Sequence, residues 1–318
     1  MSRLTSGLFL GLLAQEAAAW GNLGHETVGY VAQQFLAPKA LSFVQSSLGS
    51  TYSESLGVAA TWADTVKYET AYEWSAPLHF VDANDNPPTS CSVEETRDCG
   101  DGDCILVAIA NYTTRVAETS LSATQRQEAL KFIDHFLGDI GQPLHVENYE
   151  VGGNDIDAKC SGSSTNLHAA WDTGMLTKNV DANHGSSATT YANYLVGEIQ
   201  SGQYKSLTSS WLSCTSITEA VNNKRDAPSI ENDIRNLLEA RAEDATAKIT
   251  PLECPLVWAR EANAYDCTVV FPFSTNEDAC TGTYYSNAIP VIDLQLAKQG
   301  YRLAAWLNVI FDGATSLP

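Results

Sequence analysis

The chain has 318 residues, of which 44% are hydrophobic and 18% charged, and its formal net charge is -20. This composition is that of a globular protein and excludes an intrinsically disordered chain. The acidic balance also excludes a protein that grips duplex nucleic acid through basic side chains, because phosphate contacts are made mostly by Lys and Arg.

The first nineteen residues predict a secretory signal peptide. Arg3 precedes the apolar stretch 8–13, and Ala17-Ala18-Ala19 supplies the small residues that a signal peptidase requires. Cleavage after Ala19 would make Trp20 the mature N-terminus. No later apolar run reaches the ~20 residues needed to span a bilayer. We therefore expect a secreted, extracellular protein without a membrane partner.

Apolar residues repeat at helical spacing nearly throughout the rest of the chain. The pattern predicts helices around Val28–Leu36, ended by Pro38, and around Ile105–Val116, Leu130–Ile140, Ile230–Ala245 and Leu296–Ile310. The stretches 82–104 and 150–166 are rich in Asp, Asn, Gly, Pro and Ser and predict irregular loops. Neither stretch separates halves of different composition. Residues 20–318 therefore predict a single multi-helix domain, mainly α, with long functional loops.

Eight cysteines suit an oxidising compartment, where disulfides form and persist. Cys99 and Cys104 bracket a short acidic, Gly-rich segment. This segment favours a small disulfide loop over a calcium site, because it lacks the ligand spacing of an EF-hand loop. Asn111 begins the only N-glycosylation sequon, Asn111-Tyr112-Thr113.

Histidines paired with aspartates carry the chemistry that the sequence suggests. His135 with Asp139, and His168 with Asp172, have i, i+4 spacing and so share a helix face, and His145 follows the break at Pro143. One such pair is more often a surface ion pair than a metal site. Two pairs and a third histidine, in a chain with only six, indicate metal. Imidazole and carboxylate are ligands that zinc takes in proteins.

Several segments then carry a resemblance to a known family. They are Trp20–His25, Ala60–Asp64, His79–Asp82, His135–His145, Asn166–Asp172, 258–263 and 300–304. In order and spacing the chain resembles the three-zinc, single-strand-specific nucleases and 3′-nucleotidases of fungi and plants. The resemblance implies a fold of the zinc phospholipase C and nuclease type.

The resemblance implies three zinc ions as cofactors. One would be held by Asp64, His79 and His135, and a second by His25 with the α-amino group and carbonyl oxygen of Trp20. Asp139 would bridge these two ions. The third ion would take the ligands His145, His168 and Asp172. Because the α-amino group of Trp20 exists only after the signal is removed, an uncleaved N-terminus should abolish activity.

The implied activity is hydrolysis of single-stranded DNA and RNA to 5′-nucleotides, together with cleavage of 3′-nucleotides. Asp64 would orient the attacking water. A base would stack on Phe80, which any unpaired base can do, and would hydrogen-bond to Asp82. Without the family context, Phe80 would be interpreted as a core residue.

Three further positions belong to the implied substrate site. Gly152 and Asn154 would lie near the base. Lys67 would contact phosphate, although alone it would be interpreted as a solvated lysine.

The resemblance also implies the disulfides Cys91–Cys267 and Cys99–Cys104, which would leave Cys160 and Cys280 to each other. The stretch from about 211 to 253 looks longer than the family usually has. Cys214 and Cys254 flank it, and we expect them to pair and to close off a helical insertion.

Two other functions remain open at this stage. A secreted zinc phospholipase C resembles the family in fold and metal arrangement, and a choline headgroup would also suit Phe80 and Asp82. A non-catalytic metal-binding protein on the same fold is the second alternative, although a complete ligand set argues against it. For the nuclease we expect single-stranded nucleic acid and 3′-nucleotides as partners and a monomeric enzyme. Zinc would concentrate positive charge in the cleft, so the acidic total does not exclude such a nuclease.

Overall fold

Helices form most of the computed structural model, which describes residues 20–100, 102–214 and 252–318. The longer helices are α1 (Asn22–Gln33), α2 (Pro38–Leu48), α6 (Ile105–Ala117), α7 (Ala123–Asp139), α10 (Met175–Asn183), α11 (Ala188–Gln200), α14 (Glu253–Tyr265) and α15 (Gly282–Asp312). Short helical turns are α3 (Leu56–Ala59), α4 (Trp62–Val66), α5 (Glu95–Asp98), α8 (Glu150–Gly153), α9 (Leu167–Ala169) and α12 (Thr208–Trp211). Tighter or wider turns are η1 (Ser50–Tyr52), η2 (Glu73–His79), η3 (Pro143–Val146), η4 (Ala170–Gly174) and η6 (Asp266–Val270). The expected mainly α fold is confirmed.

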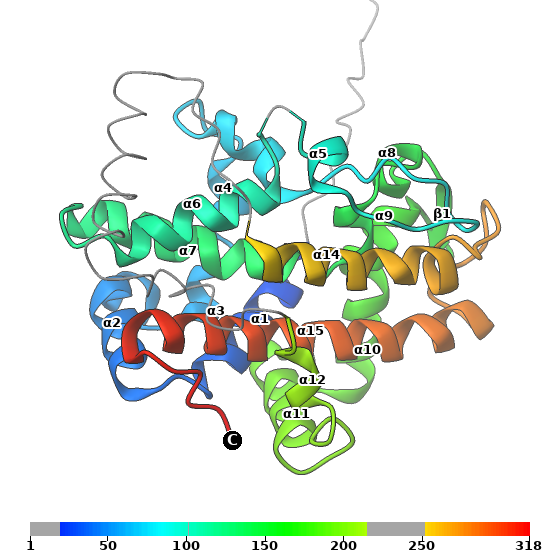
Figure 1. Ribbon diagram of the computed structural model, residues 1–318. Coiled ribbons are helices and arrows are strands. Elements are labelled where there is room, and N and C mark those ends of the chain that lie inside the picture. Colours follow the sequence, from blue (N-terminus) through cyan, green and yellow to red (C-terminus); the bar gives the residue numbers. More distant parts are fainter. Residues whose placement is uncertain (1–19, 101, 215–251) are drawn as a thin grey trace, which may run out of the picture.

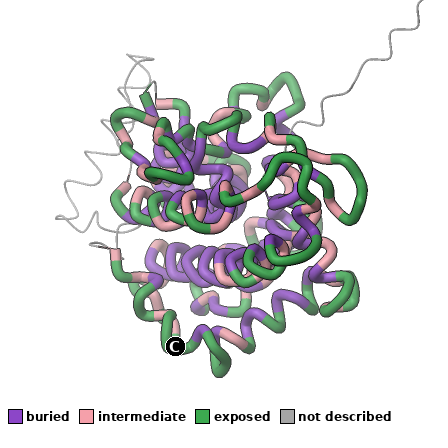
Figure 2. The backbone as a smooth tube through the Cα atoms, turned by 90° about the vertical axis from the view of Figure 1, so that its right-hand side faces the viewer, coloured by how far each residue is buried: buried purple, intermediate pink, exposed green. Residues whose placement is uncertain are grey.

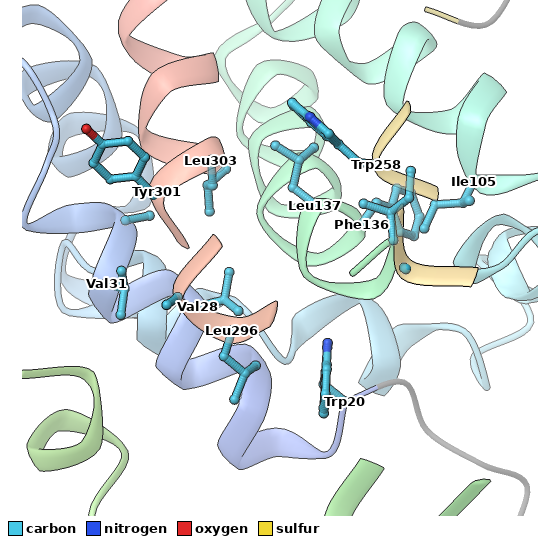
Figure 3. Packing of buried hydrophobic residues seen from close by; sticks show 14 of the residues in the cluster. Trp20, Val28, Val31, Ile105, Phe136, Leu137, Trp258, Leu296, Tyr301 and Leu303 are labelled. Atoms are coloured by element: carbon cyan, nitrogen blue, oxygen red, sulfur yellow. The ribbon is translucent and has the colours of Figure 1, made fainter. Parts of the chain in front are cut away.

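The core forms where α1 and α7 pack against the long helix α15, while α6 packs on the outer side of α7 (Figure 1). Figure 3 shows Val28 and Val31 of α1 beside Leu296 and Leu303 of α15. All four are essentially inaccessible to solvent. Burial of such side chains is worth about 1.5–3 kcal/mol each, so α1 is fixed in place although it begins only two residues after Trp20.

Two glycines set the distance between α1 and α3. A Cβ atom on Gly29 would lie 2.6 Å from the backbone nitrogen of Gly57, so only glycine permits this approach. The chain continues from α3 into α4. The close contact therefore fixes the separation between His25 on α1 and Asp64 on α4.

The predicted helix boundaries hold in part. Helix α7 begins at a capping box formed by Ser122 and Gln125 and ends at Asp139, close to the expected end. Helix α1 ends at Gln33, and Pro38 does not end it but is the first residue of α2. Proline suits a first helical position because the amide hydrogen it lacks would have no helical partner there.

The prediction that the stretch 150–166 is an irregular loop is only partly right. It contains an antiparallel hairpin of β1 (Asp157–Cys160) and β2 (Ser163–Asn166), with Asp157 opposite Asn166 and Cys160 opposite Ser163. Its strands are short and polar, so they lack the alternation of apolar residues that identifies a strand. The predicted helix 230–245, the signal peptide and most of the expected insertion lie outside the described residues.

Three disulfides join parts of the chain that are distant in sequence, Cys91–Cys267, Cys160–Cys280 and Cys214–Cys254, and a fourth, Cys99–Cys104, closes a short loop. These are the same pairs that the sequence led us to expect. Figure 2 shows buried segments in the interior and exposed segments in the peripheral loops. Among the described helices, none is both long and apolar enough to cross a membrane.

Candidate metal centre

Asp64, His79 and His135 form the first of three groups of buried potential ligands. Asp64 lies on α4, His79 ends η2 and His135 lies in the last turns of α7. Asp64 Oδ1 is 3.6 Å from His79 Nδ1 and 3.5 Å from His135 Nε2. His135 Nδ1 lies 2.6 Å from the carbonyl oxygen of Ala60 and donates to it, so Nε2 faces the carboxylates.

Asp139 connects this group to a second one, formed by His25, His135 and Asp139. Its Oδ1 lies 3.1 Å from His25 Nε2, and its Oδ2 lies 3.2 Å from His135 Nε2 and 3.1 Å from His79 Nδ1. Trp20 is fully buried beside α1 (Figure 3), and its indole nitrogen donates to the carbonyl oxygen of Gly138 at 3.2 Å. Residue 20 is therefore held against the residue that precedes Asp139.

The third group consists of His145, His168 and Asp172. His168 Nε2 is 3.0 Å from Asp172 Oδ2 and 3.3 Å from His145 Nε2. His145 Nδ1 donates to the carbonyl oxygen of His79 at 2.9 Å, and His168 Nδ1 to that of Gly152 at 2.6 Å. Both imidazoles thus turn Nε2 toward the same point. The structure brings together all eight side chains that the sequence predicts as ligands.

Unpartnered buried atoms test whether these groups suit metal. Asp64 Oδ2 and His79 Nε2 are buried and form no hydrogen bond with any described residue. Leaving such atoms unsatisfied costs about 1–3 kcal/mol each. Donor atoms that share one zinc at 2.0–2.2 Å lie roughly 3–3.6 Å apart, close to the separations found here. The donor types, spacing and orphaned atoms all fit metal ions.

The electrostatics of the centre also favour positive charge. Burial alone would lower the pKa of His135, but the charges of Asp139 and Asp64 outweigh it and raise the pKa to about 10. Burial would raise the pKa of Asp139, yet the charges of His135 and His25 hold it well below its usual value. The carboxylates therefore stay ionised and stabilise a cation between them.

Lys67 is not the solvated lysine that its sequence position alone would suggest. It is only 9% exposed, and its Nζ lies 2.8 Å from Asp64 Oδ1. Burial would lower the pKa of Lys67, but the charge of Asp64 raises it instead. A permanent positive charge is therefore fixed at the edge of the first group.

The residues expected to bind a base lie close to this centre. Phe80 is 36% exposed and directly follows His79. Asp82 is exposed, and partial desolvation and the charge of Asp98 raise its pKa. The Nδ2 atom of Asn154 lies 3.2 Å from His168 Nδ1, whose ring also contacts Gly152. Gly152 and Asn154 thus lie beside the third group.

Gln142 lies within the segment His135–His145, but its sequence position predicted no role for it. Its Nε2 donates to Asp172 Oδ1 at 2.5 Å, and its Oε1 accepts from the backbone nitrogen of Leu144 at 2.7 Å. Gln142 is completely buried. It therefore orients the Asp172 carboxylate and shapes the turn that carries His145.

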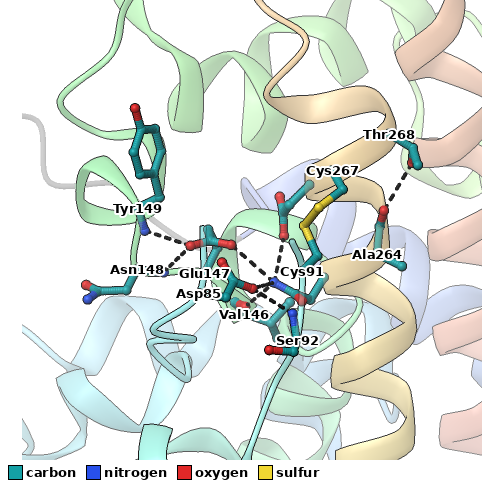
Figure 4. Close-up of a disulfide and its surroundings, with 12 residues drawn as sticks. Asp85, Cys91, Ser92, Val146, Glu147, Asn148, Tyr149, Ala264, Cys267 and Thr268 are labelled. Carbon is teal, nitrogen blue, oxygen red and sulfur yellow. Dashed lines mark hydrogen bonds between the residues drawn. A yellow bond between two sulfur atoms is a disulfide. The ribbon is translucent and has the colours of Figure 1, made fainter. Parts of the chain in front are cut away.

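An acidic cluster near the Cys91–Cys267 disulfide was not predicted, and Figure 4 shows two of its members, Asp85 and Glu147. Asn263 Nδ2 lies 3.1–3.4 Å from carboxylate oxygens of Asp85, Glu147 and Asp266. Burial raises the pKa of Glu147 to about 8 and that of Asp266 well above its usual value. Glu147 Oε1 also accepts from the backbone nitrogen of Tyr149 at 2.7 Å. The cluster holds the 82–94 loop and the segment after His145 against α14. Its members lie far apart in the sequence, so no sequence motif could have predicted the cluster.

The sequon residue Asn111 lies partly exposed on α6, at the edge of a cavity of about 660 Å³. Two residues on, the Thr113 hydroxyl is buried and accepts from the Trp306 indole at 2.9 Å. Glycosylation of Asn111 stays a prediction.

A helical, disulfide-linked domain with three adjoining groups of imidazoles and carboxylates defines a metal-dependent hydrolase. Comparison with known proteins then gives the family. Residues 20–312 match the model of the S1/P1 Nuclease family, and the chain belongs to that family.

Named relatives agree with this assignment. The chain is 43% identical to Nuclease P1 of Penicillium citrinum over 295 residues, which cover 92% of this chain and 97% of that protein. It is 42% identical to Nuclease S1 of Aspergillus oryzae over 301 residues, or 94% of each chain. It is 32% identical to Endonuclease 2 of Arabidopsis thaliana over 303 residues, covering 92% of this chain and 90% of the relative. These matches favour a nuclease over a phospholipase C or a non-catalytic protein.

Proposed function

We propose that the mature chain is a secreted, monomeric, zinc-dependent endonuclease that cleaves single-stranded DNA and RNA to 5′-nucleotides and also hydrolyses 3′-nucleotides. The observation that carries this proposal is the burial of three adjoining ligand groups, the first two of which meet at one carboxylate, Asp139. Family membership supports the reaction class.

The ligand assignment follows the three groups. Asp64, His79 and His135 would hold one zinc ion, and His145, His168 and Asp172 another. His25 and the amino group and carbonyl oxygen of Trp20 would hold the remaining ion, with Asp139 shared between the neighbouring sites. Bound zinc neutralises phosphate charge and lowers the pKa of water to about 7, which supplies a nucleophile.

Side chains near the metal ligands orient the attacking water and bind the phosphate and the base. Asp64 Oδ2, which has no hydrogen-bond partner, is free to accept a hydrogen bond from the attacking water and so orient it. Lys67, anchored on the other oxygen of the same carboxylate, places positive charge where a phosphate oxygen would lie. Phe80 offers its face to a base, while Asp82 and Asn154 offer hydrogen bonds.

Removal of residues 1–19 is part of the proposal. The family match begins at Trp20, and Trp20 is completely buried next to Asp139. Four disulfides and the signal-like N-terminus support passage through the secretory route. This route also makes the sequon at Asn111 usable.

The test is a substrate comparison with the zinc-loaded chain that begins at Trp20. Denatured DNA, RNA, 3′-AMP and phosphatidylcholine are each incubated with the protein, with and without chelator. We expect nucleotide release from both nucleic acids, phosphate release from 3′-AMP, loss of both with chelator, and recovery on adding zinc. Phosphatidylcholine turnover without nucleotide release would contradict the proposal.

A variant pair separates the metal centre from general effects on the fold. Asp139→Asn should lose activity by several orders of magnitude and bind less zinc per chain. Asp181→Asn makes the same chemical change at an exposed position of α10 and should behave as wild type. Equal activity of the two variants would contradict the role of Asp139.

A further inference from the structure

A second cavity, of about 270 Å³, includes in its lining Glu150 and Asp155, which flank Gly152 and Asn154 of the candidate base site in the sequence. Its aromatic lining comes from Tyr149, Phe271 and Phe273, and its acidic lining from Glu150, Asp155 and Asp157. The volume is slightly below the range of about 300–1,000 Å³ that is usual for ligand pockets, so it suits a single flat ring system. None of the eight predicted side-chain ligands and none of the assigned base-binding residues lines it.

The aromatic walls of this cavity are open and fixed in position. Tyr149 is 43% exposed, and its ring meets that of Phe271 edge to face, with centroids 5.2 Å apart. Phe273 is held in turn by Tyr284, with ring centroids 4.8 Å apart. The backbone nitrogen of Tyr149 donates to Glu147 at 2.7 Å. Rings held in this way present a stacking surface at little cost in conformational entropy.

One turn joins the cavity to the base site. Residues 150–153 all have positive φ angles, including 49° at Glu150 and 55° at Val151. Two consecutive non-glycine residues in this region store strain that the surrounding structure must hold. Because of this turn, Glu150 lines the cavity while Gly152, two residues on, contacts His168.

The charge of the cavity limits what can enter it. Glu150, Asp155 and Asp157 form no ion pair with any other described residue. Three unpaired carboxylates repel phosphate, so the nucleic acid backbone must remain outside. They accept hydrogen bonds from ring and amino N–H groups, which are most numerous on adenine, guanine and cytosine.

We propose that this cavity is a subsite for the base of a neighbouring nucleotide of the single strand, with preference for bases that carry an amino group. The base stacks on the ring of Tyr149, which Phe271 supports edge to face, and the carboxylates of Glu150 and Asp155 accept its N–H groups. The subsite extends recognition beyond the nucleotide at the metal centre and requires an unpaired strand, because a paired base has no free face or edge. This inference rests on the proposed function.

The test compares a substrate that reaches the subsite with one that cannot. The hexanucleotide (dA)6 spans both sites, whereas 3′-dAMP fills only the base site. Tyr149→Ala should lower kcat/KM for (dA)6 about 10-fold, mainly through KM, and leave 3′-dAMP hydrolysis unchanged. Tyr149→Phe keeps the stacking ring and should match wild type on both substrates.

A second variant tests the carboxylates without disturbing the aromatic packing. Glu150→Gln combined with Asp155→Asn changes only exposed side chains. The double variant should have a smaller ratio of kcat/KM for (dA)6 to kcat/KM for (dT)6. This ratio is divided by the corresponding ratio for 3′-dAMP and 3′-dTMP, which corrects for base preference at the base site. Wild-type selectivity in this double variant would overturn the role of the carboxylates.

The remaining outcomes separate the two proposals. Equal loss on (dA)6 and 3′-dAMP in Tyr149→Ala would show that Tyr149 acts through the metal centre or the fold, and would overturn the subsite. No loss on either substrate would overturn it as well. Failure of wild-type protein to hydrolyse either substrate would instead overturn the proposed function, and the subsite with it.

Discussion

The imidazole of His25 stacks on that of His135, with ring centroids 3.7 Å apart and planes inclined by 13°. His25 lies near the first of the described residues and His135 near the end of α7, and both reach Asp139. Burial and the charge of His135 lower the pKa of His25, whereas the two carboxylates raise that of His135 to about 10. The stacked pair thus holds the N-terminal segment next to Asp139, and of the two rings only that of His135 favours the protonated, positively charged form.

The contact between Gly138 and His25 predicts a sensitive position. A Cβ atom on residue 138 would lie 3.0 Å from His25 Nδ1, so Gly138→Ala should displace the ring. We expect kcat/KM for 3′-AMP to fall roughly 10- to 100-fold, as small misplacements of reacting groups do. Gly197→Ala on α11 is the matched control, since nothing lies within 4 Å of its Cβ. The control should keep its activity and gain up to about 1 kcal/mol of stability; similar activity in both variants would contradict the prediction.

The position of Trp20 predicts that a free N-terminus is required. One extra residue before Trp20 would convert the amine into an amide, which cannot coordinate zinc, next to a fully buried side chain. We expect this extended protein to lose activity and to bind fewer zinc ions per chain, measured by elemental analysis. An extension of the same length after Pro318 serves as the control. Full activity in the N-terminally extended protein would refute the assignment of Trp20.

The hydrogen bond from Gln142 to Asp172 predicts an effect on the third ligand group. Gln142→Ala removes the donor that orients this carboxylate, and such changes typically cost 10–100-fold in metal affinity or activity. Titration with a competing chelator should show one zinc ion released at lower chelator concentration than in wild type. Gln127→Ala, at the other end of α7, removes a bond to the Ser47 carbonyl and should leave all zinc affinities unchanged. An unchanged chelator titration for Gln142→Ala would argue against this orienting role.

The raised pKa of Asp293 on α15 leads us to expect that the stability of the fold depends on pH independently of metal binding. Burial raises its pKa to about 6, although Tyr191 donates a hydrogen bond to it. The unfolded chain loses this proton near the usual pKa of 3.8 and the folded chain only near 6. The stability that this group contributes is therefore present at pH 3.8 and below and is lost as the pH rises to 6, by up to about 3 kcal/mol.

Asp293→Asn removes this titration. Between pH 4 and pH 7.5, the melting temperature of the variant should rise relative to wild type. Asp181→Asn, at an exposed position of α10, should show no such pH-dependent difference. A constant gap between Asp293→Asn and wild type across this range would rule out the raised pKa as the cause.

Local patterns in the sequence determined much of this protein. The apolar repeats indicated the mainly α class, and the i, i+4 pairs pointed to His135, Asp139, His168 and Asp172 as ligands, because these features act within one or two turns of chain. The remaining ligands were implied by the family resemblance. The motifs from Trp20 to Asp172 indicated the family, and the family model matches the same region.

Tertiary structure decided what depends on residues distant in sequence. Only packing of α1 on α15 and α3 brings His25 to Asp139, and only the fold buries Lys67 beside Asp64. The acidic cluster around Asn263 and the cavity beside Tyr149 are each formed by segments that lie far apart in the sequence. No local pattern encodes such neighbours, because burial and hydrogen bonding across the core are set by the whole packed structure.

The net charge of -20 illustrates the same division. The sequence gives the total and, through it, argues against broad contact with duplex phosphate. The fold decides where the charges act: Asp64, Asp139 and Asp172 are buried around positions that attract metal, while Glu150, Asp155 and Asp157 lie at a cavity that repels phosphate. Charge determines recognition only after folding has fixed its distance and exposure, since both set the strength of every electrostatic interaction.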